Sequence, residues 1–380
     1  MDEEAYVLLL STSKINLERR YILKSSKKIV ICVLLIVVSI ISLILINKNT
    51  NKTFNYKGST IALTIDGNSA TSFPTSGKYN VTVNCNNAKG RWNPKTWKLE
   101  ITKITGTVTC DVSFNSSVTN LTTQVNNKAT RNENGKRYKG KNPDNYIWFN
   151  DGLWRIIGNI PVCLTSGCSS TQNRVKIIRN DSIGRIAYGS NSTWIGSNIQ
   201  NLLNTCYLGK TSSCDSYCYS NSDYGVKGTC DYSSDGIDAT DYYGQMIEDV
   251  YFNVGAGDST HKTAANYYTQ EIVTHATSAS KIGLMFASDW GYAIEGFTGI
   301  LGSIGSPKSY MEKNWLFSNG NEWTMSAYSS SYPLCTFNYG YLHYIGSSVG
   351  YSIRPVLYLK SNVYVVSGNG SKVEPYRIGI

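Results

Sequence analysis

Alternating apolar and polar residues recur along the part of the chain that follows residue 56. Four such runs, separated by turn residues, are TIALTID at 60–66, KYNVTVNC at 78–85, KLEITKI at 98–104 and TVTCDVSF at 107–114. Because successive side chains of a strand point to opposite faces of a sheet, a period of two predicts strands. We expect residues 57–118 to form a small antiparallel β-module.

A larger domain is predicted over residues 138–380, where short aromatic and β-branched runs replace the alternation. IWFN at 147–150 and LWRIIG at 153–158 flank Asn150-Asp151-Gly152, which predicts a hairpin turn. Strands are also predicted at 175–180 and 354–359. Residues 281–293 are predicted to begin as a short buried strand and to end in a polar loop. A closing hairpin is predicted around 368–370.

Helices are predicted at two places in this domain. Apolar residues at helical spacing predict a helix over 194–208 with Ser192 or Thr193 as its cap, and a weaker helix over 246–256. The residues between the two folded parts, 119–137, are rich in Asn, Ser and Thr and poor in apolar residues. This composition indicates a linker.

One stretch is apolar without interruption. Ile29 to Ile46 has 18 residues and no charge, close to the minimum for a helix that crosses a bilayer. Five Lys and Arg residues lie in residues 19–28, so residues 1–28 are expected in the cytoplasm and the C-terminus outside. A cleaved signal peptide is the alternative, although no small-residue cleavage site follows. We therefore expect a single-pass protein of the cell membrane, with a signal anchor at 29–46 and a polar tether at 47–56.

The net charge of +10 lies mostly beyond the apolar stretch. An excess of positive charge favours contact with anionic polymers outside the cell. The alternative is that these side chains form an ordinary solvated surface. Nucleic acid is not an expected partner, because the predicted compartment is wrong and no recognition motif occurs.

The cysteines agree with an oxidising compartment, since nine of the ten follow the apolar stretch. Cys85 and Cys110 lie in two predicted strands of the β-module, where a disulfide would offset a small core. Zinc is the alternative to disulfides for four further cysteines, although no CxxC spacing occurs among them: Cys206, Cys214, Cys218 and Cys230. Cys335 is expected to remain unpaired.

Residues 323–353 contain no charged side chain. Their abundance of Tyr, Ser, Gly and Asn is typical of antibody binding loops. The alternative is a set of ordinary strands in a Tyr-rich domain, but a buried strand favours more Val, Ile and Leu than occur here. We expect one exposed contact surface made by Tyr328, Tyr332, Phe337, Asn338, Tyr339, Tyr341, His343 and Tyr344.

Several motifs in residues 138–380 resemble those of a known family. They are GKNPDNYIWFNDGLWRIIG, VKIIRNDSIG, KIGLMFASDWGYA, NEWTMS and the closing IRPVLYLKSNVYVVSGNGSKVEPYRI. They resemble surface proteins of anaerobic gut bacteria that carry a C-type-lectin-like domain of the formylglycine-generating-enzyme type. The resemblance implies an α+β domain preceded, in this chain, by the transmembrane helix and the small all-β module.

Some members of that family are variable proteins of diversity-generating retroelements. In those proteins a C-terminal stretch is rewritten by adenine-directed mutagenesis, and its side chains form the ligand-binding face. The resemblance implies this role for residues 323–353 and adds Leu334 to the ligand-binding residues, with Trp323 and Arg354-Pro355 as the frame.

Enzymatic chemistry finds little support in the sequence. The formylglycine-generating group uses a pair of cysteines in its C-terminal part, where this chain has only Cys335. Asp289 and Glu322 could form a carboxylate pair, but a carboxylate beside Trp is more often structural. We expect no enzyme activity and no cofactor or metal site.

The function predicted from the sequence is that of a membrane-anchored, receptor- or adhesin-like protein that binds an extracellular protein or glycan. An enzyme of the formylglycine-generating type with unknown substrate, and a structural component of the cell envelope, are the alternatives.

Overall fold

The computed structural model describes residues 54–380 except 57–58, 190–191, 220–226, 255–256, 274–276 and 303–311. The predicted segments 1–28 and 29–46 therefore lie outside the described residues. Within the described ranges no helix is long and apolar enough to cross a membrane. This finding goes against the predicted single-pass localisation.

The fold is mostly β, with 39% of residues in strands and 12% in helices, so the predicted α+β class with a preceding transmembrane helix is corrected. The chain divides into two compact units. Among the described residues, a small unit comes from 54–77, 82–91 and 100–114, and a larger unit takes those from 115 to 380 together with the short stretches 78–81 and 92–99.

The small unit contains a five-stranded sheet in which β1, β2, β7 and β4 lie in that order and β3 pairs with β2. A separate hairpin joins β5 to β6. The bounds are β1 Phe54–Tyr56, β2 Ser59–Ile65, β3 Asn68–Ser69, β4 Asn80–Asn86, β5 Lys89–Asn93, β6 Lys98–Thr102 and β7 Thr109–Asn115. The end of the predicted tether is thus strand β1.

Strand β7 shows why this sequence forms a sheet. Its residues alternate between exposed and buried along the whole strand, and Cys110, Val112 and Phe114 face the core. Cys110 is bonded to Cys85 of β4, the disulfide predicted above. The prediction of a purely antiparallel module is wrong, because β2 and β7 pair in parallel. Alternation specifies which residues face inward, but it does not specify the direction of the partner strand.

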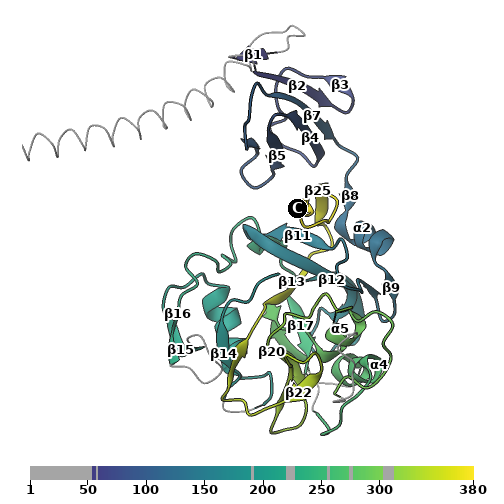
Figure 1. Cartoon of the computed structure of the whole chain (residues 1–380), viewed down its shortest axis with the longest axis vertical. Helices are drawn as coiled ribbons and strands as arrows, with labels where there is room; N and C mark the ends of the chain where they lie inside the picture. The colour runs from purple at the N-terminus through teal and green to yellow at the C-terminus, as the bar shows by residue number, and fades with distance from the viewer. Residues whose placement is uncertain are drawn as a thin grey trace, which may run out of the picture. The chain divides into compact units, whose positions relative to one another are not determined.

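Three sheets form the larger unit (Figure 1). The first has the order β18-β17-β12-β13-β24-β19, with β9, β10 and β11 attached beside β12; the second has the order β16-β15-β14-β23-β20-β21-β22; the third is β26-β25-β8. The bounds of the first sheet are β9 Arg131–Asn132, β10 Lys136–Arg137, β11 Tyr146–Phe149, β12 Gly152–Cys163, β13 Thr171–Arg179, β17 Val250–Asn253, β18 Thr277–Ser280, β19 Ile282–Gly283 and β24 Val356–Leu359.

The second sheet consists of β14 Arg185–Ala187, β15 Cys214–Tyr219, β16 Lys227–Cys230, β20 Glu322–Ala327, β21 Pro333–Thr336, β22 Leu342–Tyr344 and β23 Gly350–Ser352. The third consists of β8 Thr119–Asn120, β25 Tyr364–Ser367 and β26 Arg377–Gly379. The helices are α2 Leu121–Lys128, α3 Asn198–Asn201, α4 Ala264–Tyr268, α5 Ala287–Tyr292, and the short π or 3-10 segments η1 Leu202–Tyr207, η2 Gly244–Met246 and η3 Thr269–Val273.

The hairpin between β11 and β12 follows the sequence prediction. Asn150 and Asp151 both have positive φ, 49° and 54°, as a type I′ turn requires. The long strands β12 and β13 then run through the middle of the larger unit, and β20 and β22 lie at the end of it opposite to β8 and β25 (Figure 1).

Three local predictions are wrong. Residues 119–137 are not a linker, because Leu121 and Val125, four residues apart on α2, are buried in the core. The predicted helix over 246–256 is not formed in its described part, which contains strand β17 at Val250–Asn253, and the predicted polar loop after 281–285 contains helix α5. The predicted helix over 194–208 is present only from Asn198, and its cap is Ser197, whose Oγ accepts a hydrogen bond from the Gln200 N–H.

Disulfides account for the remaining paired cysteines. The pairs are Cys163–Cys168, Cys206–Cys214 and Cys218–Cys230, so the zinc alternative is excluded for these residues. Among the described cysteines, Cys335 is buried and forms no disulfide.

Candidate functional site

The uncharged stretch 323–353 supplies four neighbouring strands of the second sheet, β20 to β23. One set of its side chains is completely buried: Trp323 and Met325 of β20, Leu334 and Cys335 of β21 and Leu342 of β22. The indole N–H of Trp323 donates to the carbonyl of Ile186 at 2.8 Å. About half of the stretch is therefore core, which the low content of aliphatic residues does not indicate.

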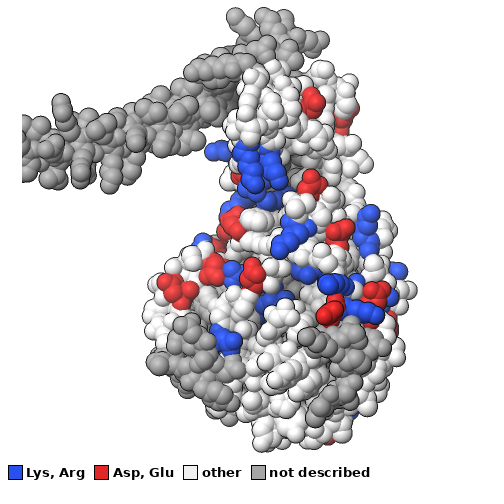
Figure 2. All heavy atoms as spheres, in the orientation of Figure 1, with Lys and Arg blue, Asp and Glu red and all other residues white. Residues whose placement is uncertain are grey.

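Aromatic side chains from the loops and strand edges of this region form a second, outward-facing set. We call it the aromatic face; it consists of His261, Tyr328, Tyr332, Phe337, Tyr339, Tyr341, His343 and Tyr344. Each ring contacts at least one other ring of the set. The surface around β20 and β22 is almost free of charged side chains on the side seen in Figure 2.

Tyr344 is the centre of one half of the aromatic face. Its ring stacks on that of Tyr328, with centroids 4.0 Å apart and planes 8° from parallel. Tyr332 contacts it at 5.5 Å, and His261 reaches Tyr328 at 5.0 Å. The contacts at 5.5 and 5.0 Å have the separations of favourable aromatic pairs.

Phe337 is the centre of the other half. Its centroid lies 5.4 Å from Tyr339 and 5.6 Å from Tyr341. His343 contacts Phe337 at 5.1 Å and Tyr344 at 5.4 Å, so this ring joins the two halves. The mutual contacts restrict the rotamers of the rings before any ligand arrives.

The structure brings together most of the residues proposed from the sequence. Tyr332 and Tyr339 are 43% and 63% exposed, Asn338 is exposed, and the other rings are half-buried. Leu334 is the exception, since it is 0% exposed. All four residues of β21 are buried, so this side chain belongs to the core and its assignment to the ligand-binding face is corrected.

His261 is the member that sequence reasoning missed. It lies 67 residues before Tyr328 in the sequence, and no local pattern marks it. Two contacts with Tyr328 position the loop that carries His261. Gly257 packs against the backbone of Tyr328, and a Cβ added at Gly257 would lie 2.0 Å from the Tyr328 carbonyl carbon. The Ser259 N–H donates to the Tyr328 carbonyl at 2.8 Å. Only glycine fits at residue 257.

The two histidines keep the face uncharged at neutral pH. Burial, together with the nearby His343, lowers the pKa of His261, and burial lowers the pKa of His343. Both imidazoles are therefore neutral at pH 7.

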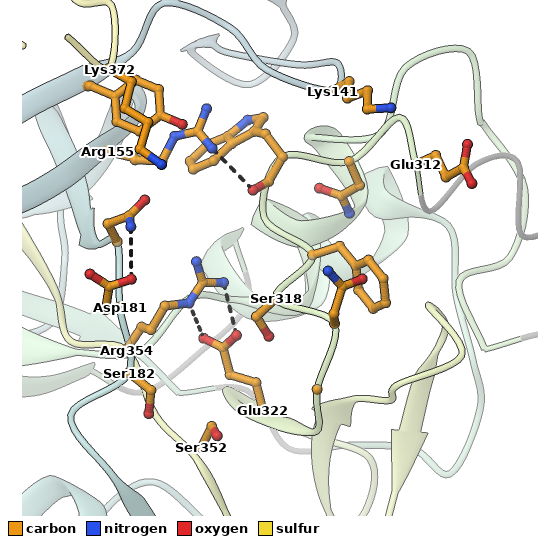
Figure 3. A pocket seen from close by; sticks show the side chains of 17 residues that line it. Lys141, Arg155, Asp181, Ser182, Glu312, Ser318, Glu322, Ser352, Arg354 and Lys372 are labelled. Carbon is orange, nitrogen blue, oxygen red and sulfur yellow. Dashed lines mark hydrogen bonds and ion pairs between the residues drawn. The ribbon is translucent and has the colours of Figure 1, made fainter. Parts of the chain in front are cut away.

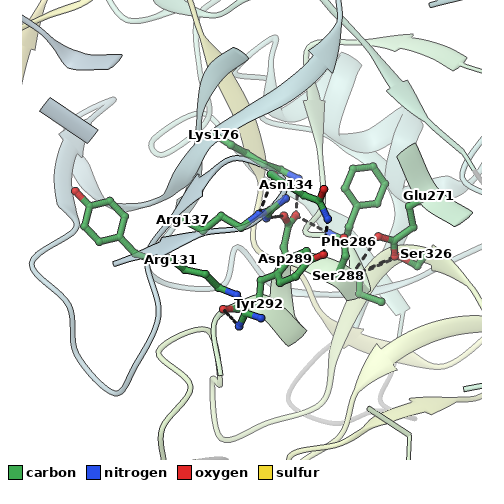
Figure 4. Close-up of polar contacts among 12 residues, drawn as sticks. Arg131, Asn134, Arg137, Lys176, Glu271, Phe286, Ser288, Asp289, Tyr292 and Ser326 are labelled. Atoms are coloured by element: carbon green, nitrogen blue, oxygen red, sulfur yellow. Dashed lines mark hydrogen bonds and ion pairs between the residues drawn. The ribbon is translucent and has the colours of Figure 1, made fainter. Parts of the chain in front are cut away.

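A buried ionic network in the same unit joins Arg137 of β10, Lys176 of β13 and Asp289 of α5 (Figure 4). Asp289 accepts from Arg137 at 2.7 Å, from Lys176 at 2.5 Å and from the Phe286 N–H at 3.0 Å. Burial alone would raise the pKa of Asp289, but the charges of Lys176 and Arg137 outweigh burial and hold the pKa low.

Glu271 lies beside this network. Its hydrogen-bond partners among the described residues include no Lys or Arg side chain. The Ser326 hydroxyl and the Ser288 N–H donate to its carboxyl group. Burial raises the pKa of Glu271 to about 7.

The carboxylate pair considered from the sequence is not formed. Asp289 is held by Lys176 and Arg137, whereas Glu322 makes a two-point ion pair with Arg354 at 2.8 and 2.9 Å. Both carboxylates thus have structural partners.

Comparison of the chain with protein-family models, with curated proteins and with solved structures found no match.

Proposed function

We propose that this chain is an extracellular ligand-binding protein that contacts a protein partner through its aromatic face. The observation that carries the proposal is the continuous set of eight uncharged rings, which includes the well-exposed Tyr332 and Tyr339. Clustered exposed aromatic side chains mark interaction surfaces. The four disulfides are typical of proteins outside the cell.

The chemistry of the face favours a protein over a polar ligand. Tyr and His rings provide large apolar areas with a polar edge, and Tyr is enriched among residues that dominate binding energy. Because the rings already contact one another, little conformational entropy is lost on binding. The absence of charge on the stretch avoids the desolvation of unpaired ions in a buried interface.

A binding assay with single substitutions tests the assignment. The full chain is screened against a panel of purified surface proteins and a glycan array, and each hit is retested with Tyr332→Ala and Tyr339→Ala. Each change should weaken binding of a protein hit by about tenfold or more, as for residues that dominate an interface. Ile104→Ala is the control, since Ile104 is as exposed as Tyr339 but belongs to the small unit.

The result that would overturn the proposal is a protein ligand whose affinity is unchanged by both Tyr substitutions. Hits confined to the glycan array, if Tyr332→Ala or Tyr339→Ala weakens them, would instead assign the face to carbohydrate.

We further propose, from the resemblance to retroelement variable proteins on a C-type-lectin-like scaffold, that the aromatic face is diversified. Sequencing of this gene from many isolates should find substitutions concentrated at the exposed and half-buried positions of the face, namely 328, 332, 337–339, 341, 343 and 344. The buried Trp323, Met325 and Leu342 should not vary. Substitutions spread evenly over buried and exposed positions would contradict this proposal.

A further inference from the structure

The larger unit also contains a pocket of about 840 Å³, within the usual range for small-ligand sites. Arg155 of β12, Arg354, and residues around Ser318 and Ser182 line it, and Figure 3 shows these side chains around one cavity. None of the rings of the aromatic face lines the pocket, so it is a second site.

Arg155 is the unusual residue of this pocket. The residue is 6% exposed, and the central carbon of its guanidinium lies 4.2 Å from the ring centroid of Tyr146 and 4.5 Å from that of Trp315. Nε donates to Asn145 Oδ1 at 2.9 Å, and the two terminal nitrogens donate to the carbonyls of Trp315 and Pro143 at 3.5 and 3.3 Å.

No carboxylate of the described chain forms an ion pair with Arg155. Burial and the neighbouring charge of Arg354 lower its pKa to about 10, so the group still carries its charge at neutral pH. A buried cation without a counterion is costly. The three hydrogen bonds use three of its five N–H groups, which leaves two for a ligand.

The other charges around the pocket are balanced. Arg354 is neutralised by Glu322. At the exposed edge, Lys141 and Lys372 are matched in number by Asp181 and Glu312. The one excess positive charge of the pocket is therefore that of Arg155.

We propose that this pocket binds an acidic sugar, such as a uronic acid residue, with the carboxylate on Arg155. A planar guanidinium pairs with a carboxylate through two parallel hydrogen bonds. The remaining lining supplies hydroxyl and amide groups for sugar hydroxyls: Asn180, Ser182, Ser318, Asn319 and Ser352.

Calorimetry and saturation-transfer NMR with the full chain test this proposal. Glucuronic acid should bind, whereas its methyl ester and glucose, which lack the carboxylate, should bind at least about tenfold more weakly. Inorganic phosphate is the control for unspecific attraction of anions. Glucuronate binding that is no stronger than phosphate binding would overturn the sugar assignment, and no binding of either would overturn the site.

Two substitutions locate the ligand. Arg155→Lys keeps the positive charge but removes the two-point geometry, so glucuronate binding should fall about tenfold. Ser318→Trp should fill the pocket from an exposed position and abolish binding even if the Arg155 variant does not fold. Tyr339→Ala should leave glucuronate binding unchanged. Unchanged binding in Ser318→Trp, or loss of binding in Tyr339→Ala, would place the sugar elsewhere.

Discussion

The carboxylate of Asp289 holds two buried cations, Arg137 and Lys176. Asp289→Asn should therefore lower the free energy of unfolding by about 3–5 kcal/mol, because both cations lose their counterion in the core. Urea denaturation measures the loss. Asp249→Asn is the control, since Asp249 pairs with Lys281 at an exposed position and such pairs contribute up to about 1 kcal/mol. Equal losses in the two variants would contradict the structural role of the network.

Glu271 predicts a pH dependence of stability. Its folded pKa of about 7 lies above the ordinary value of 4.5, so the folded protein binds the proton more tightly than the unfolded chain. Protonation of Glu271 therefore stabilises the folded protein fully below about pH 4.5. As the pH rises from there to 7, the free energy of unfolding should fall by about 3 kcal/mol. Glu271→Gln should abolish this decline. The measurement is the free energy of unfolding of both proteins between pH 4.5 and 8; parallel curves would disprove the assignment.

His343, on the aromatic face, predicts the opposite dependence of stability on pH. Because its folded pKa is lowered, the unfolded chain binds the proton more tightly, and stability is lost as the pH falls below about 6.5. Protonation also places a charge at the junction of the two halves of the aromatic face. Binding of an apolar partner should weaken between pH 7.5 and 5, and His343→Phe should reduce that weakening. A variant with the same pH profile as the wild type would show that His343 is not responsible.

At the scale of single elements, the short polar helix α2 is held in place by two buried side chains and one N-cap hydrogen bond. Leu121 and Val125 are its buried residues, and the Asn120 side chain accepts from the Thr122 N–H at 2.8 Å. Asn120→Ala should lower the free energy of unfolding by about 0.5–2 kcal/mol through loss of the cap. Asn120→Asp retains the accepting oxygen but loses the amide that donates to the Ser361 carbonyl at 2.6 Å, so it should recover only the part of the loss that belongs to the cap. A neutral Asn120→Ala would contradict the capping role.

At the scale of the whole molecule, the two units differ in how they are held together. The small unit has few buried side chains, and its disulfide closes a loop of 25 residues. Replacing Cys85 and Cys110 by Ser should destabilise this unit by about 3 kcal/mol. Hydrogen exchange should then increase within residues 59–77, 82–91 and 100–114 and remain unchanged in the core strands β12, β13 and β24. A uniform increase over both units would contradict an effect of this disulfide that is confined to the small unit.

The sequence by itself determined features that depend on neighbouring residues. The alternation in β7, the turn at Asn150-Asp151 and the uncharged, Tyr-rich composition of 323–353 are all local, because side-chain period, positive φ and lack of charge are properties of short segments. The pairing of Cys85 with Cys110 also followed from two strand patterns.

Only the tertiary structure decided which side chains meet over long separations. It placed His261 on the aromatic face, buried Leu334, left Arg155 without a carboxylate partner among the described residues and paired β2 with β7 in parallel. Several arrangements satisfy the same local pattern, and the one that forms is the one that buries the apolar side chains together while its buried polar groups find partners. That choice depends on the whole chain at once, so no short segment contains it.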